Sequence, residues 1–370
     1  TDMSSQLVNL NLGYGNKAIN EAIKEQVDKY CFVGPSLGVE SRAKIAKKIV
    51  DLMPDNMGKV FFTNAGADAN ENAIKIARMY TGRNKIFSRY RSYHGSSFGA
   101  GNLTGEPRRF PLEPGVPGFI KFMTPYVYRE AVEFESEEAA TKYYLTKLRE
   151  QIIYENPDNI AAIVMETITG SNGVIIPPKG YLPGVRKICD EFGILMICDE
   201  VQCGMGRTGA MFAWQAYDIK PDIMSMAKAI GSGIPVGAFA MTEEVAKYSL
   251  EPGDHGTTYG GNPLACTAVS KTIEIFEKKH LVEHVQKVGA YLTKKLEELV
   301  EEYDTVKAVK GKGLMQGIQV TKPISEITGA ALKEGLLIIG AGSDVIRFVP
   351  PLIIELEQVD EMIRILKKAL

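Results

Sequence analysis

The sequence predicts an α/β protein in which a large α/β domain is followed by a smaller α+β domain. From about residue 60 to residue 245, short apolar runs alternate with amphipathic stretches, which is typical of a sheet covered by helices. Pro263 then opens a long stretch with apolar residues at helical spacing. The remaining chain combines two strand-like runs with a closing helix. With 370 residues, the chain is long enough to form two cores.

Each expected element follows from its local pattern. Short apolar runs predict strands at 59–63, 84–88, 161–166, 194–200, 223–228, 237–242, 314–320 and 345–351. Helical periodicity predicts helices at 67–80, 141–154, 182–192, 263–279, 281–303 and 357–370. These elements divide the chain into an N-terminal segment at 1–35, a large domain at 36–260 and a small domain at 261–370. The N-terminal segment is expected to pack with the small domain.

Composition excludes several classes of function. A hydrophobic content of 45% and a charged content of 24% are those of an ordinary globular protein. The net charge of −2 indicates neither a nucleic-acid nor a membrane partner, and the longest apolar runs have only the length of a strand. Five scattered cysteines indicate reduced thiols and a cytoplasmic location. His280 and His284 lack a third ligand nearby, so no metal site is expected.

Three predicted strands end in residues that carry chemistry, namely Glu166, Asp199 and Lys228. Ligands bind beyond the carboxyl ends of the strands in open α/β sheets, so one pocket is expected to hold all three. A lysine removed from water has a lowered pKa and can form a Schiff base. Pyridoxal 5′-phosphate requires such a lysine, together with an acid that keeps its pyridine nitrogen protonated. Lys228 and Asp199 therefore predict a site for this cofactor.

The stretch TNAGADANENAIKIAR, residues 63–78, offers a place for the phosphate of that cofactor. A turn of small residues leads directly into a helix, so the backbone N–H groups of Gly66 and Ala67 would point at the anion. Tyr93 could stack on the cofactor ring, and Gly95 would let the backbone come close. His94 is interpreted as a structural histidine.

The stretch GMGRTG, residues 204–209, matches the glycine pattern of a dinucleotide-binding loop. In such a loop the strand runs straight into the glycines, and an acidic residue follows about twenty positions later. Here residues 199–203 separate the strand from the glycines, and no second strand ending in an acid follows at that distance. A dehydrogenase is therefore the weakest interpretation.

Together, these motifs resemble the class III pyridoxal-phosphate aminotransferases, which include acetylornithine, ornithine, γ-aminobutyrate and ω-amino acid:pyruvate aminotransferases. The resemblance runs from NLGYGN at 11–16 through ICDEVQCGMGRTG and HGTTYGGNPLAC to VIRFVPPL at 345–352. It implies fold type I, with a mostly parallel seven-stranded sheet sandwiched between helices. It also implies a homodimer with the active site at the subunit interface.

The resemblance implies a role for each matching residue. Lys228 would form the internal aldimine and move the substrate proton, and Asp199 would pair with the pyridinium nitrogen. The other cofactor contacts would come from Val201 and Tyr93 on the two ring faces, Gln202 near the phenolic oxygen, Glu166 beside the ring, and Gly66 and Ala67 at the phosphate. Thr258 would reach the phosphate of the neighbouring subunit. Arg347 would bind a substrate carboxylate through its planar fork of N–H groups.

The implied reaction moves an amino group from an ω-amino acid or an acetylornithine-like donor to 2-oxoglutarate or pyruvate. It would pass through the Lys228 aldimine and pyridoxamine phosphate. An aminomutase or racemase on the same scaffold is the alternative, since both use the same lysine and the same electron sink.

The chain departs from the family pattern at several positions. Ala65 stands where a serine usually contributes a hydroxyl to the phosphate, so weaker cofactor binding is expected. Ser171 replaces the glutamate of the acetylornithine type, and Ser96 replaces an arginine. The first half therefore favours the pyruvate-using branch, whereas the second half resembles the acetylornithine branch, which fits either a divergent member or a constructed hybrid. The start of the chain is expected to be truncated relative to the family.

Overall fold

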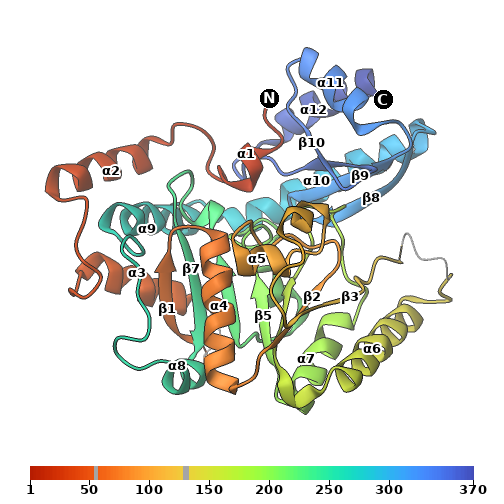
Figure 1. Cartoon of the computed structure of the whole chain (residues 1–370). Helices are drawn as coiled ribbons and strands as arrows, with labels where there is room; N and C mark the ends of the chain where they lie inside the picture. Colours follow the sequence, from red (N-terminus) through yellow and green to blue (C-terminus); the bar gives the residue numbers. More distant parts are fainter. Residues whose placement is uncertain (54–56, 128–132) are drawn as a thin grey trace.

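The computed structural model describes residues 1–53, 57–127 and 133–370, which form two sheets with their covering helices (Figure 1). The larger sheet has seven strands in the order β1-β7-β6-β5-β4-β2-β3. Strand β7 runs opposite to the other six strands of this sheet. The strands are β1 (Met57–Thr63), β2 (Lys85–Arg89), β3 (Phe119–Phe122), β4 (Ile160–Glu166), β5 (Leu195–Asp199), β6 (Ile223–Met226) and β7 (Gly237–Thr242). The predicted α/β class with a mostly parallel seven-stranded sheet is confirmed.

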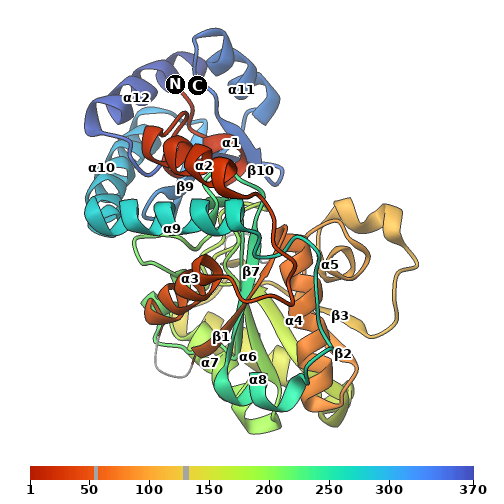
Figure 2. The ribbon, with the colours of Figure 1, turned by 90° about the vertical axis from the view of Figure 1, so that its left-hand side faces the viewer.

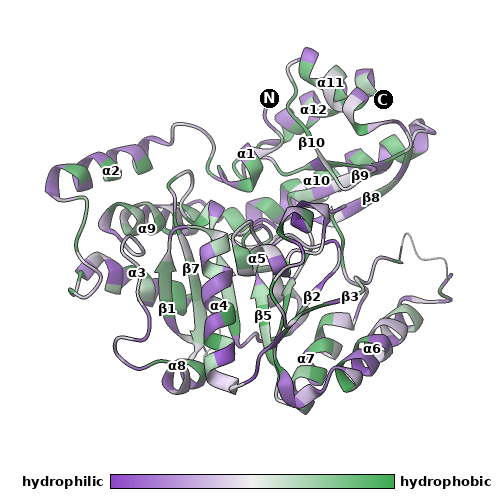
Figure 3. Ribbon diagram, in the orientation of Figure 1, coloured by the Kyte–Doolittle hydropathy of each residue, from purple (hydrophilic) through white to green (hydrophobic). Residues whose placement is uncertain are grey.

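The central strands are buried along their whole length, which explains why they read as continuous apolar runs. Figure 3 shows this apolar centre of the sheet. The six strands expected between residues 59 and 242 all form. Strand β3 escaped prediction because it has four residues, of which only Phe122 is fully buried, so its pattern is weak.

Helices cover both faces of this sheet, as Figure 2 shows edge-on. Ala162 and Val164 of β4 pack in one core with α4 (Gly66–Thr81), whereas the alternate residues Ile163 and Met165 pack in another with α7 (Tyr181–Phe192). Successive side chains of a strand point to opposite faces, so this division places the two helices on opposite sides. The remaining helices around this sheet are α3 (Glu40–Asp51), α5 (Phe98–Leu103), α6 (Glu137–Tyr154) and α8 (Glu243–Ser249).

The smaller sheet contains four antiparallel strands in the order β10-β11-β9-β8. These are β8 (Val306–Lys312), β9 (Met315–Val320), β10 (Ile339–Ala341) and β11 (Val345–Phe348). The sequence predicts a strand over 345–351, but β11 ends at Phe348 because Pro350 and Pro351 follow and proline has no backbone N–H to donate. The accompanying helices are α9 (Pro263–Lys278), α10 (Leu281–Glu302), α11 (Ile324–Lys333) and α12 (Leu356–Ala369).

The start of the chain lies against the smaller sheet, close to the C-terminus (Figures 1 and 2). The Met3 N–H donates to the Leu337 carbonyl at 2.9 Å, and the Val349 N–H donates to the Met3 carbonyl at 2.8 Å. The helices α1 (Ser5–Val8) and α2 (Lys17–Lys29) follow. The domain boundaries near residues 35 and 260 stay a prediction. In the described ranges, no helix is long and apolar enough to cross a membrane.

Candidate active site

A cavity of about 440 Å³ lies at the carboxyl edge of the large sheet. Its volume falls within the roughly 300–1,000 Å³ that is typical of small-molecule sites. Eight of the ten residues predicted for the site line it, namely Gly66, Ala67, Tyr93, Glu166, Asp199, Val201, Gln202 and Lys228. They come from the ends of β4, β5 and β6, the start of α4 and the loop after β2. Parallel strands therefore bring together residues that are far apart in the sequence.

Lys228 lies two residues beyond the end of β6, in the short 3-10 helix Lys228–Ile230. The sequence predicts it as the last residue of the strand, but the chain turns at this point, and Lys228 adopts a positive φ of 49°. This conformation is strained for a side chain larger than glycine and is found mostly where function requires it. Burial lowers the pKa of the Lys228 amine, although Asp199 partly opposes the shift. The lowered pKa favours the neutral amine, which is the nucleophilic form.

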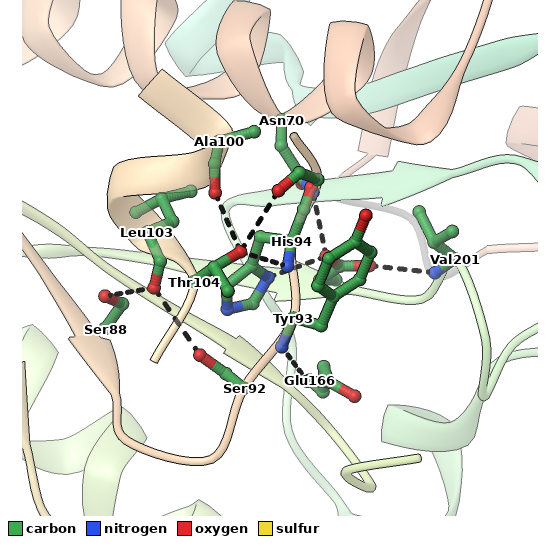
Figure 4. Close-up of polar contacts among 12 residues, drawn as sticks. Asn70, Ser88, Ser92, Tyr93, His94, Ala100, Leu103, Thr104, Glu166 and Val201 are labelled. Carbon is green, nitrogen blue, oxygen red and sulfur yellow. Dashed lines mark hydrogen bonds and ion pairs between the residues drawn. The ribbon is translucent and has the colours of Figure 1, made fainter. Parts of the chain in front are cut away.

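Asp199 is almost completely buried at the end of β5 and accepts three hydrogen bonds. Nδ1 of His94 lies 2.7 Å from its Oδ2, Nδ2 of Asn70 lies 2.8 Å from the same oxygen, and the Val201 N–H donates to Oδ1 at 3.0 Å (Figure 4). Burial by itself opposes ionisation of Asp199, but these donors outweigh it and lower the pKa of the carboxyl group. Asp199 is thus held as a carboxylate that faces the cavity.

Two of the donors to Asp199 are not among the predicted site residues. His94 is more than the structural histidine that the sequence suggested, because it contacts the Asp199 carboxylate directly. Asn70 also donates to the His94 carbonyl at 2.8 Å, so it ties the histidine and the aspartate together. The signal for Asn70 was present in the sequence: it is a polar residue on the face of α4 that buries Ala73, Ile74 and other apolar side chains.

The start of α4 gives the cavity a set of free backbone N–H groups. The helix begins at Gly66, and the first N–H groups of a helix have no partner within it. A Cβ atom on Gly66 would lie 3.0 Å from both methyl groups of Val201, and one on Gly95 would lie 2.6 Å from the Ala67 Cβ. Only glycine permits this close packing. A phosphate group therefore fits this helix start, and its binding by Gly66 and Ala67 stays a prediction.

Tyr93 lines the cavity and is held both at its backbone and at its ring. Its backbone N–H donates to Oε1 of Glu166 at 3.0 Å, and the Arg108 guanidinium lies 3.8 Å from the ring centroid. The other oxygen of Glu166 accepts the Gly170 N–H at 2.9 Å. Burial raises the pKa of the Glu166 carboxyl. Glu166 thus anchors the backbone of Tyr93. Arg108 contacts Tyr93 from the 3-10 helix Pro107–Leu112, which the sequence did not assign to the site.

The two remaining predicted residues do not line the cavity. Arg347 of β11 is almost fully buried and lies behind Gln202, with its Nη1 donating to Oε1 of Gln202 at 2.9 Å. Burial lowers the pKa of Arg347 to about 10. Thr258 is exposed and is not part of the lining contributed by the described residues of this chain.

A lysine with a lowered pKa, a hydrogen-bonded carboxylate and a helix start around one cavity define a pyridoxal-phosphate enzyme. The family described as Aminotransferase class-III matches residues 1–370. The chain therefore belongs to the class III aminotransferases, and its reaction is transamination with pyridoxal 5′-phosphate. The aminomutase or racemase alternative is not favoured.

Individual relatives agree with this family. An acetylornithine aminotransferase of Methanocaldococcus jannaschii is 39% identical over 366 residues, which is 96% of this chain and 85% of the relative. A solved taurine:2-oxoglutarate aminotransferase from Bifidobacterium kashiwanohense, in complex with the cofactor and glutamate, is 41% identical with a TM-score of 0.94. That match covers 99% of this chain and 87% of the solved one. An (S)-enantioselective ω-transaminase from Thermomicrobium roseum is 33% identical, with a TM-score of 0.94 over 100% of this chain and 87% of the solved one.

Proposed function

We propose that this aminotransferase takes an amine donor that carries an acid group at its other end and passes the amino group to a 2-oxo acid. The observation that carries the proposal is Arg347, a buried cation that has no ion-pair partner among the described residues. A substrate carboxylate or sulfonate would supply the missing negative charge. Both an acetylornithine aminotransferase and a taurine:2-oxoglutarate aminotransferase are among its relatives, and each of these donors carries an acid group.

The chemistry that pyridoxal phosphate supplies when bound is an electron sink for the bond at the substrate carbon. Lys228, held next to Asp199 with a lowered pKa, would move the proton at that carbon through its Nζ. Asp199 would hold a proton on the ring nitrogen, since His94 and Asn70 keep its carboxyl ionised. Val201 and Tyr93 would confine the ring from its two faces, and the N–H groups of Gly66 and Ala67 would hold the phosphate.

We further propose a cytoplasmic homodimer in which Thr258 completes the phosphate site of the neighbouring subunit. Support comes from apolar residues that remain exposed beside Thr258, since large exposed apolar patches mark interaction surfaces. Phe32 and Tyr259 meet edge-to-face at 5.8 Å between ring centroids, and Leu37 is exposed as well. The five free cysteines favour a reducing compartment.

The first test is an absorbance spectrum of the cofactor-loaded protein during each half-reaction. Adding an acid-bearing amine without acceptor is expected to bleach the yellow band, and adding pyruvate or 2-oxoglutarate is expected to restore it. The amine and the oxo acid that act fastest identify the donor and the acceptor. A neutral amine of the same length that bleaches the band equally fast would contradict the role of Arg347.

The dimer is tested by comparing two neighbouring threonines. Thr258→Ala is expected to weaken cofactor binding by about tenfold, as expected for losing one hydrogen bond to a charged group. Thr257→Ala is the matched control and should leave the affinity unchanged. Sedimentation of the parent protein as a monomer would overturn the proposal.

A further inference from the structure

The side chain of Gln202 makes two hydrogen bonds with other side chains. Its Oε1 accepts from Nη1 of Arg347 at 2.9 Å, and its Nε2 donates to Oγ of Ser171 at 2.7 Å. Gln202 lines the cavity, whereas Arg347 does not. The amide of Gln202 therefore stands between the cavity and the guanidinium.

Arg347 has fewer partners than its burial requires. Only 6% of the residue is exposed, and its Nε is buried without a hydrogen-bond partner among the described residues. A buried charge is costly unless it is paired. The negative charge of Glu166 acts on Arg347, but its carboxylate oxygens already accept the N–H groups of Tyr93 and Gly170. The site therefore has an unmet demand for an anion.

The surroundings of Arg347 reinforce this demand. The charges of Arg108 and Arg207 interact with that of Arg347, and Arg207 is fully buried. Arg207 is occupied by the carbonyls of Leu314 and Pro350. A local excess of positive charge attracts an oxyanion.

The backbone near Gln202 leaves space for its side chain. A Cβ atom on Gly170 would lie 2.4 Å from Oε1 of Gln202 and 2.6 Å from Cε of Met315. Glycine at 170 is thus what lets the amide reach Arg347. Ser171, which holds the other end of the amide, is fixed in turn by the Gly342 N–H that donates to its carbonyl at 3.2 Å.

We propose that Gln202 is a neutral gate over Arg347, which a substrate carboxylate or sulfonate displaces when it binds the guanidinium. The inference rests on the proposed role of Arg347 and deepens it. Because the gate is an amide, the incoming acid group has to break a hydrogen bond and does not have to break an ion pair. Gln202 is thus a residue that tunes specificity for acidic substrates.

The gate is tested by binding glutarate to the cofactor-loaded protein, measured by titration calorimetry. Glutarate carries two carboxylates but neither an amino nor an oxo group, so it binds without reacting. Gln202→Glu is expected to raise its dissociation constant about tenfold or more, because the new carboxylate would pair with Arg347 and compete. Gln202→Met, similar in size and unable to accept a comparable hydrogen bond, should bind glutarate at least as tightly as the parent. Glutaramide, the neutral analogue, should be insensitive to both changes.

Two further variants separate failure of the gate from failure of the proposed function. Arg347→Gln should weaken glutarate binding more than Gln202→Glu does. Should Arg347→Gln lose glutarate while Gln202→Glu keeps the parental affinity, the anion site stands and the gate is wrong. If Arg347→Gln also keeps the parental affinity, the assignment of Arg347 fails and the gate fails with it. Should Gln202→Glu not fold, Ser171→Glu places a carboxylate at the other end of the amide and is expected to weaken glutarate binding likewise.

Discussion

Two buried charges, Asp199 and Arg347, differ in how many partners they have. Asp199 accepts hydrogen bonds from a histidine, an asparagine and a backbone N–H. Arg347 donates to one amide oxygen and leaves its Nε without a partner among the described residues. A charge with all of its partners inside the protein is fixed in position, whereas a charge with too few partners is ready for a ligand. The protein thus fixes Asp199 by itself, whereas Arg347 is the charge for which we propose an acidic substrate as partner.

The largest expected effect is at Lys228, on whose pKa both of these charges act. Lys228→Ala should lower kcat by roughly 10²–10⁴-fold, because the group that moves the proton is lost. The measurement is the steady-state rate with the best donor and acceptor. Lys220→Ala, at an exposed lysine, is the matched control and should keep the parental rate. A Lys228→Ala protein with a rate close to that of the parent would contradict the assignment.

The second effect concerns the partners of Asp199. Asn70→Ala removes the 2.8 Å hydrogen bond to Oδ2, so the pKa of Asp199 should rise toward its ordinary value. The carboxylate becomes less well held, and the dissociation constant of pyridoxal phosphate should increase roughly tenfold. Fluorescence titration with the cofactor measures this dissociation constant. Asn72→Ala serves as the control, because Asn72 lies on the same helix but bonds Asp68. Equal affinity in Asn70→Ala and the parent would show that Asp199 does not need this partner.

The third effect concerns the close packing of Gly95 against Ala67 at the predicted phosphate site. Gly95 has a φ of 139°, and a Cβ there would lie 2.6 Å from the Ala67 Cβ. Gly95→Ala should lower the free energy of unfolding by about 1–3 kcal/mol and weaken cofactor binding. Gly329→Ala, in the middle of α11 with no atom within 4 Å of the new Cβ, should instead stabilise by about 0.5–1 kcal/mol. Urea unfolding of both variants and the parent measures these free energies. A Gly95→Ala protein as stable as the parent would contradict the close packing at Gly95.

The smallest effect is on the pH dependence of stability in the cofactor-free protein. Burial lowers the pKa of Lys228 from 10.5, so the unfolded chain holds this proton over a pH range in which the folded protein has released it. The contribution of Lys228 to stability therefore grows as the pH rises from its folded pKa toward 10.5. Lys228→Met should lack this increase. Free energies of unfolding measured between pH 7 and pH 10 for the parent and Lys228→Met test this prediction. Curves that run parallel for these two proteins would contradict it.

Local sequence patterns determined much of the fold and of the predicted cofactor site. Buried parallel strands are continuous apolar runs, so six strands of the large sheet could be predicted from the sequence. Lys228 and Asp199 stood out because a charged residue directly after such a run needs an explanation. The small-residue turn before α4 likewise indicated a helix start that could hold an anion.

Only the tertiary structure decided which side chains meet. Gln202, after β5, and Arg347, in β11 of the smaller sheet, are 145 residues apart. Asn70 reaches Asp199 across 129 residues. No periodicity in the sequence records such contacts, because they depend on how β11 is placed against the loop after β5. The turn that gives Lys228 a positive φ was hidden for a related reason, since surrounding contacts hold it against the preference of the residue itself. The sequence by itself thus determined the cofactor, while the packing of distant elements decided that Arg347 meets Gln202.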